Sequence, residues 1–125
     1  MKLDARGEIR LVGVHRDLAR VVRAALELTT VEFTVTEGLR TLERQRALKA
    51  KGASRTLNSR HLTGHAVDLA ARMDGVIRWD WPLYAQLARA MKAASVREGV
   101  PIVWGGDWKS LKDGPHFELD RKAYP

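Results

Sequence analysis

The 125-residue chain contains no cysteine. This absence excludes disulfide bonds, thiolate nucleophiles and cysteine-based zinc sites, and it leaves histidine and carboxylate as the available strong metal ligands. Histidine is also scarce, because the chain has only four. Any site built on imidazole must therefore draw on a small and identifiable set of residues.

A long hydrophobic run is missing as well. No segment approaches the roughly 18 consecutive apolar residues that a membrane-spanning helix needs. The first residues, MKLDARGEIR, lack the apolar core of a signal peptide. We therefore expect a protein that makes no stable membrane insertion, resides in the cytoplasm and does not use the general secretory route. If the substrate lies outside the cytoplasm, a separate protein would have to release this one from the cell interior.

Length and charge narrow the class of protein further. A chain of 125 residues suits one core, so we expect residues 1–125 to form a single domain and a monomer with one site. The net charge of +7 favours polyanions such as nucleic acid, anionic lipid or anionic wall polymers. The basic residues are spread over the expected helices instead of being gathered with aromatic residues, which argues against a nucleic-acid partner.

Hydrophobic patterning predicts alternating helices and strands. Apolar residues at helical spacing and end signals predict helices at 16–29, 41–51 and 81–97, the last of them capped by Asp80. Alternating or β-branched segments predict strands at 33–36, 65–70, 101–104 and 116–119. This order favours an α+β domain in which helices cover a small, mainly antiparallel sheet.

The densest polar segment has the sequence SRHLTGHAVD and runs from Ser59 to Asp68. Side chains alternate along a strand, so Asp68 shares a face with Ala66 and Ala70, whose small size leaves room above that face. His61, just before the strand, can fold back toward it. A single histidine beside a single aspartate is more often an ordinary hydrogen-bonded pair, so this segment alone does not establish a metal site.

A second polar segment runs from Asp113 to Leu119, where a Gly-Pro turn delivers His116 to the start of a strand. If the two strands are neighbours, His61, Asp68 and His116 converge. Three protein ligands with a fourth position open are typical of a catalytic zinc site, whereas four close a structural one. Hydrolysis of an amide also needs a group that accepts and returns a proton, and Asp113 is the candidate.

Other residues near these segments have more than one interpretation. Glu118 either supports the ligands or faces solvent, and the second alternative is favoured. We expect His65 to be packed or hydrogen-bonded and His15 to cap the first predicted helix. Trp104 and Trp108 either line a cleft or belong to the core.

These segments resemble a known family of enzymes. The S-x-H-x-x-G-x-A-x-D pattern of the zinc D-alanyl-D-alanine carboxypeptidase superfamily is matched by Ser59, His61, Gly64, Ala66 and Asp68, and the late D-x-x-H pair completes it. Within that superfamily, residues 36–41, 104–108 and 113–119 look like the bacteriophage endolysins that act as L-alanyl-D-glutamate peptidases. Together the similar segments extend from about residue 15 to residue 119.

The resemblance implies the hedgehog-like fold of zinc D-Ala-D-Ala carboxypeptidases. It implies a zinc ion bound by His61, Asp68 and His116, with Asp113 as general base and acid. Relatives that remove terminal D-alanine generally carry glutamate at the base position, so Asp113 favours the endolysin branch. The alternatives are a D-alanyl-D-alanine carboxypeptidase that uses the same zinc site and a non-catalytic zinc-binding or wall-binding module. The presence of Asp113 argues against the non-catalytic module.

The resemblance also implies how the substrate is bound and reached. It places Arg40 and Gln45 near the substrate, with Ser59 supporting the site near His61. A planar guanidinium binds a carboxylate through two parallel hydrogen bonds, and the peptidoglycan stem peptide is rich in carboxylates. The implied protein accumulates in the host bacterial cytoplasm and reaches the cell wall after a membrane-permeabilising partner releases it.

Overall fold

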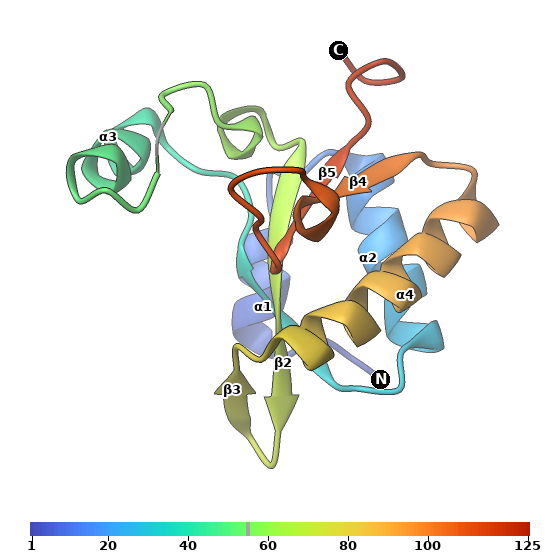
Figure 1. Ribbon diagram of the computed structural model, residues 1–125. Helices are drawn as coiled ribbons and strands as arrows, with labels where there is room; N and C mark the ends of the chain where they lie inside the picture. The colour runs from blue at the N-terminus through green and yellow to red at the C-terminus, as the bar shows by residue number, and fades with distance from the viewer. Residues whose placement is uncertain (55) are drawn as a thin grey trace.

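The computed structural model describes residues 1–54 and 56–125 as helices packed around one antiparallel sheet (Figure 1). The helices are α1 (Ala5–Leu11), α2 (Arg16–Leu28), α3 (Leu42–Ala50) and α4 (Trp81–Glu98). The strands are β1 (Phe33–Glu37), β2 (Ala66–Met73), β3 (Val76–Arg78), β4 (Ile102–Trp104) and β5 (His116–Leu119). Two short 3-10 helices are η1 (Arg60–Thr63) and η2 (Gly105–Asp107).

The sheet has the strand order β1-β2-β5-β4, with β3 paired to β2 as a hairpin. Each pairing is antiparallel. Strand β2 is therefore central, and its register with β5 sets Asp68 directly opposite His116. The expected α+β fold with a mainly antiparallel sheet is confirmed.

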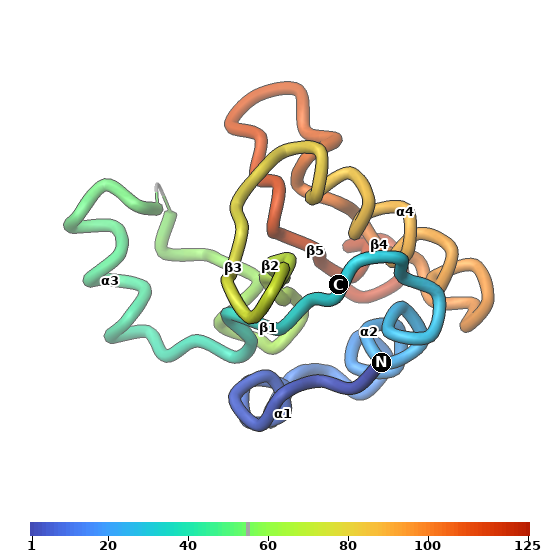
Figure 2. The backbone as a smooth tube through the Cα atoms, turned by 90° about the horizontal axis from the view of Figure 1, so that it is seen from below, coloured from blue at the N-terminus to red at the C-terminus, as the bar shows by residue number. Residues whose placement is uncertain are grey.

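The hydrophobic core lies between the sheet and the pair α2 and α4. These two helices lie side by side on one side of the molecule in both views, whereas α3 projects from the other side (Figures 1 and 2). Val21 of α2 and Met91 of α4 are fully buried, as are Val67 of β2 and Phe117 of β5. The burial of these four side chains holds β2 and β5 against the helices and leaves the opposite face of these strands to form a site.

Two elements were absent from the sequence-based expectation. Helix α1 is only seven residues long, with Gly7 and Leu11 as its buried residues, so it shows no apolar periodicity. Strand β3 is three residues long and fully exposed, so it shows no alternation. Its pairing extends β2 to Met73, beyond the expected end at Ala70.

The cap of α4 differs in mechanism from the expected one. Asp80 occupies the position before the helix, but its side chain makes no cap hydrogen bond. The carboxylate pairs instead with Arg78 on β3.

Within the described residues, no helix is both long enough and apolar enough to cross a membrane.

Two glycines allow the segments that carry the site to pack closely against the start of the chain. A Cβ atom on Gly38, just after β1, would lie 1.9 Å from the carbonyl oxygen of Arg10. Gly64, after η1, has a φ of +74°, and a Cβ there would lie 2.5 Å from the carbonyl oxygen of Gly13. Backbone therefore touches backbone at both positions, where no larger residue fits.

We predict that Gly38→Ala lowers the free energy of unfolding by at least about 2 kcal/mol, because the backbone must shift to admit the methyl group. Denaturant unfolding measures the loss. The control is Gly75→Ala in the β2–β3 hairpin, where φ is +78° but no atom lies within 4 Å. That variant should lose only about 1 kcal/mol, from the left-handed backbone alone. Equal losses in the two variants would refute the close-packing explanation for Gly38.

Candidate metal centre

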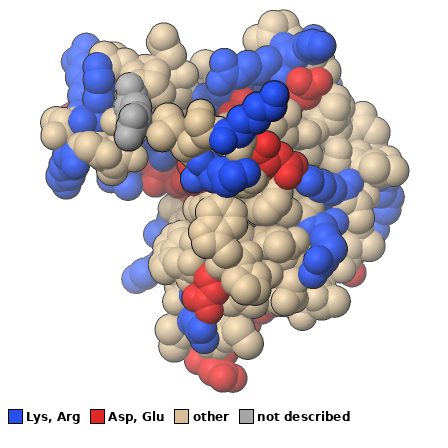
Figure 3. Space-filling model, viewed as in Figure 1, with Lys and Arg blue, Asp and Glu red and all other residues tan. Residues whose placement is uncertain are grey.

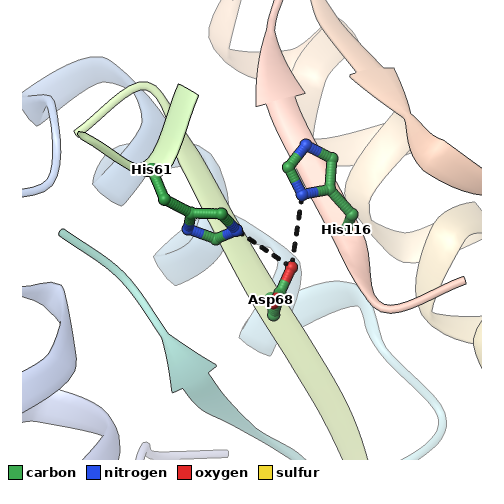
Figure 4. Close-up of side chains that lie close together, drawn as sticks. All are labelled: His61, Asp68 and His116. Atoms are coloured by element: carbon green, nitrogen blue, oxygen red, sulfur yellow. Dashed lines mark hydrogen bonds and ion pairs between the residues drawn. The ribbon is translucent and has the colours of Figure 1, made fainter. Parts of the chain in front are cut away.

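Three polar side chains from η1 and two paired strands meet at one point (Figure 4). The Nε2 atom of His61 lies 3.2 Å from Oδ1 of Asp68, and the Nδ1 atom of His116 lies 3.3 Å from the same oxygen. One nitrogen or oxygen atom from each residue lies within 4.8 Å of the others, so the group could hold a metal ion. The structure thus brings together the three residues that the sequence nominated as ligands.

The outer nitrogen of each imidazole binds an acceptor. His61 Nδ1 lies 2.9 Å from the carbonyl oxygen of Gly38, and His116 Nε2 lies 2.9 Å from Oε1 of Glu118. A carbonyl oxygen and a carboxylate accept hydrogen bonds, so both nitrogens must donate. In the neutral rings, the inner nitrogens then direct lone pairs toward Asp68. Histidines that bind metals are commonly held in this way.

This arrangement requires a positive charge at its centre, because two lone pairs and a carboxylate face one another. Burial disfavours a charged imidazole, but hydrogen bonds to Asp68 and Glu118 outweigh it and raise the pKa of His116 to about 9. Burial likewise disfavours a charged Asp68, yet hydrogen bonds from His116 and His61 hold its pKa far below the usual value. In the absence of a metal, a proton on imidazole supplies the charge that a cation would otherwise provide.

Glu118 is buried, so the expectation that it faces solvent is wrong. Only 5% of its surface is exposed. Its second oxygen lies 3.3 Å from Nε of Arg121 and 3.8 Å from Nε of Arg60. Alternation along β5 correctly places Glu118 on the face of His116, but these two arginines, from other segments, cover that face. Burial raises the pKa of Glu118, but the hydrogen bond from His116 outweighs this effect and lowers it.

Asp113 lies in the same cleft, held by the turn that precedes β5. Its backbone N–H donates to the carbonyl oxygen of Gly105, and its own carbonyl oxygen accepts from the N–H of His116. A Cβ on Gly105 would lie 2.4 Å from the Asp113 carbonyl oxygen and 3.1 Å from Cβ of His116. Burial, together with the negative charge of Asp68, raises the pKa of Asp113. A carboxyl group with a raised pKa is suited to accept and return a proton.

Arg40 approaches the cluster and is held by two neighbours. Its Nε donates to Glu37 over 2.8 Å, its Nη1 donates to Oε1 of Gln45 over 2.7 Å, and its Nη2 lies 4.0 Å from Oδ2 of Asp68. Gln45 is fully buried, and its amide nitrogen donates to Ser54 and to the Thr56 carbonyl oxygen. Gln45 therefore supports Arg40 from behind and has no exposed surface for a substrate.

The remaining residues singled out in the sequence take different places. Ser59 accepts a hydrogen bond from the N–H of His61 and so begins η1. His15 caps α2 and His65 binds Thr63, as expected. Trp104 packs against the core and donates to the Gly114 carbonyl oxygen. Trp108 lines the cleft, with its ring 5.2 Å from that of His116.

The cleft around the cluster has a volume of about 790 Å³. The contributors that sequence reasoning missed include Glu37, Trp79 and Leu111. For Glu37 a signal was present, because arginines follow it at positions i+3 and i+7 and both bind its carboxylate. No local pattern marks the other two, which reach the cleft through the turns that follow β3 and η2.

We predict that the affinity of the cluster for a divalent cation rises about tenfold per pH unit from about pH 7 to about pH 9. The raised pKa of His116, about 9, means that a cation must displace a proton below that pH. A histidine of ordinary pKa, about 6.5, would give little further rise above pH 7. Calorimetric titration at several pH values measures the slope.

The control variant for this titration is Glu118→Gln. It keeps an oxygen that accepts from His116 Nε2 but removes the negative charge, so the pKa of His116 should fall and the affinity should level off at a lower pH. An affinity that is already flat above pH 7 in the native protein would contradict the raised pKa.

The solved structures that resemble this fold include ChiX and VanXYg. The crystal structure of ChiX, an L-Ala D-Glu endopeptidase of Serratia marcescens, matches with a TM-score of 0.93 and 52% identity, over 99% of this chain and 94% of that one. VanXYg, a vancomycin resistance D,D-dipeptidase, matches with a TM-score of 0.58 and 21% identity, over 85% of this chain and 50% of its own. The second match supports the fold alone.

Three relatives found by sequence comparison carry the same activity in their names as ChiX. The L-alanyl-D-glutamate peptidase of Escherichia phage T5 is 32% identical over 98% of this chain and 92% of its own length. The L-alanyl-D-glutamate peptidase of Listeria phage A118 is 33% identical, over 78% of this chain and 34% of that protein. The peptidoglycan L-alanyl-D-glutamate endopeptidase CwlK of Bacillus subtilis (strain 168) is 30% identical over 81% of this chain and 68% of its own.

The family model described as phage L-alanyl-D-glutamate peptidase matches residues 1–124. This match covers the cluster, the cleft and the whole sheet. The chain therefore belongs to the phage L-alanyl-D-glutamate peptidase family.

Proposed function

We propose that this chain is a zinc endopeptidase that hydrolyses the bond between L-alanine and D-glutamate in the peptidoglycan stem peptide. The observation that carries the proposal is the pair of imidazoles, each held by an outer acceptor so that its lone pair faces Asp68 inside a cleft. The named activities of the phage T5 and Bacillus subtilis relatives support the choice of bond. On this proposal residues 1–125 act as one peptidase domain and as a monomer.

The donor set fits zinc. His61 and His116 would supply two nitrogens and Asp68 one oxygen, which leaves a fourth position for the reaction. A bound zinc ion supplies Lewis acidity, which makes water acidic enough to react near neutral pH and polarises the scissile carbonyl. Asp68 can contribute an oxygen because its low pKa keeps it ionised.

Asp113 would move the proton. It accepts a proton from the water that attacks the carbonyl carbon, and it returns the proton to the nitrogen as the C–N bond breaks. The products are a new carboxylate on L-alanine and a free amine on D-glutamate. The raised pKa of Asp113 suits both steps, because the carboxyl group can hold the proton between them.

Arg40 would orient the substrate through a carboxylate. Its guanidinium is held by Glu37 and Gln45, so little side-chain freedom is lost when a ligand binds. Ser59 would act indirectly, by holding the backbone of η1 that presents His61. We further propose that the enzyme accumulates in the host cytoplasm and reaches the wall when a separate protein permeabilises the membrane.

Asp113→Asn should lower kcat at least about 100-fold, because the amide cannot accept the proton. Zinc content should not change. The melting temperature should not fall, since the variant removes a charge that burial disfavours. Mass spectrometry of purified muropeptides, digested with and without a chelator, measures the products and separates cleavage after L-alanine from removal of terminal D-alanine. Undiminished cleavage by the variant would remove Asp113 from the mechanism.

His61→Ala should abolish zinc binding, because it deletes one of three ligands. The matched control is His65→Ala, four residues along, whose imidazole is bonded to Thr63 away from the cluster. Metal analysis after dialysis, and the rise of melting temperature on adding zinc, measure binding independently of activity. Native protein and His65→Ala should both be stabilised by zinc. Full zinc occupancy in His61→Ala would overturn the assignment of the ligand.

A further inference from the structure

Three large apolar side chains line the cleft on segments that follow β3 and η2. Trp79, Trp108 and Leu111 all line it. Trp79 is 53% exposed and Leu111 is 61% exposed, so neither contributes its full surface to the core. Trp108 reaches the cluster, with its ring 5.2 Å from that of His116. These three side chains, called the apolar wall from here on, thus include one beside the reacting groups and two that are largely exposed.

The backbone of Leu111 is held in an unfavourable conformation. Its φ is +54°, in the left-handed region that leucine rarely adopts. In the described part of the chain the other non-glycine residue with positive φ is Asp74, which lies in a hairpin turn where aspartate is tolerated. Leu111 gains little packing in return, because most of its surface faces solvent. Strain of this kind without burial is typical of residues retained for a ligand.

Most of the other residues that line the cleft are polar or charged. Four of the described arginines line it, from the segment before α3, from α3 itself, from η1 and from the segment after β5, namely Arg40, Arg44, Arg60 and Arg121. In Figure 3 basic side chains gather over α3 and the upper part of this face, while uncharged surface lies below them. Lys112, which follows Leu111 in the chain, also lines the cleft, and its Nζ lies 3.3 Å from the carbonyl oxygen of Gly106. The cleft thus has a basic part and an apolar part.

The proposed substrate has the same asymmetry. On the amine side of the scissile bond, D-glutamate and the residues beyond it carry free carboxylates, which suit arginine. On the carbonyl side, L-alanine is joined through a lactyl amide to an N-acetylated amino sugar, and this part carries no carboxylate. A sugar ring has an apolar face large enough to cover an indole ring. The methyl group of alanine is too small to do so.

We propose that Trp79, Trp108 and Leu111 form a subsite for the N-acetylmuramoyl sugar that precedes the scissile bond. The subsite rests on the proposed function, and it sets the direction in which the substrate lies across the cleft. The sugar packs on the apolar wall and the carboxylate-bearing residues extend toward the arginines. The enzyme accordingly prefers stem peptides that are still attached to glycan over free peptides.

The test compares two substrates that differ in the sugar alone. One is N-acetylmuramoyl tripeptide, and the other is the same tripeptide carrying only lactate on the L-alanine nitrogen. The ratio of their kcat/KM values should favour the sugar-bearing substrate in the native enzyme. This ratio should fall about fivefold in Trp79→Ala. Leu111→Gly should lower the ratio without lowering the melting temperature, because glycine relieves the strained backbone.

Trp81→Ala is the matched control. Trp81 is 49% exposed, close to Trp79 in sequence and in exposure, but it packs against Tyr84 and Trp104 and does not line the cleft. The ratio of kcat/KM values for the two substrates in Trp81→Ala should equal that of the native enzyme. A native enzyme that cleaves both substrates equally well, or a ratio unaffected by Trp79→Ala, would overturn the subsite and leave the proposed function intact. Cleavage of neither substrate would overturn both.

Discussion

The pairing of β2 with β5 is the constraint on which the rest of this structure depends. In antiparallel strands, residues directly opposite each other project from the same face at short distance. The register sets Asp68 opposite His116, so a carboxylate and an imidazole start from neighbouring positions and meet at 3.3 Å. Buried neighbours such as Val67 and Phe117 hold that register against the helices, because a slip of one residue would turn them out of the core.

The third ligand candidate depends on packing instead of pairing. His61 lies on η1, whose position is set by Ser59 at its start and by Gly64 at its end. The end of β1 contributes the carbonyl oxygen of Gly38, which fixes the orientation of the imidazole. Because Gly38 itself packs against the backbone of Arg10, the geometry of the cluster is coupled to the contact between β1 and α1. Binding of a cation at the cluster would therefore stabilise the whole fold.

The division of the cleft follows from which segments supply its walls. Helix α3 and η1 come from polar, arginine-rich sequence and are anchored by buried partners such as Gln45 and Glu118. The segments after β3 and η2 instead bring the exposed side chains of Trp79 and Leu111 to the cleft and place Trp108 beside His116. A substrate with carboxylates on one side of its scissile bond and an uncharged sugar on the other can satisfy both walls in one orientation.

The sequence by itself determined the parts whose signals are local. The periodicity of α2, the end signals of α4, the β-branched run of β1 and the Gly-Pro turn before His116 were sufficient to predict the main elements and the α+β class. Local alternation placed Asp68 on an accessible face between two alanines. Together with the second polar segment, this was enough to nominate His61, Asp68, His116 and Asp113.

Tertiary structure decided the parts that depend on distant neighbours. Helix α1 and strand β3 are too short to show a period, so their existence depends on packing and pairing. Whether Glu118 is buried depends on arginines at positions 60 and 121, and alternation along its own strand carries no information about them. Gln45 supports Arg40 because the residues around it bury it completely. A pattern in the sequence can show which face a side chain occupies, but only the folded chain decides what covers that face.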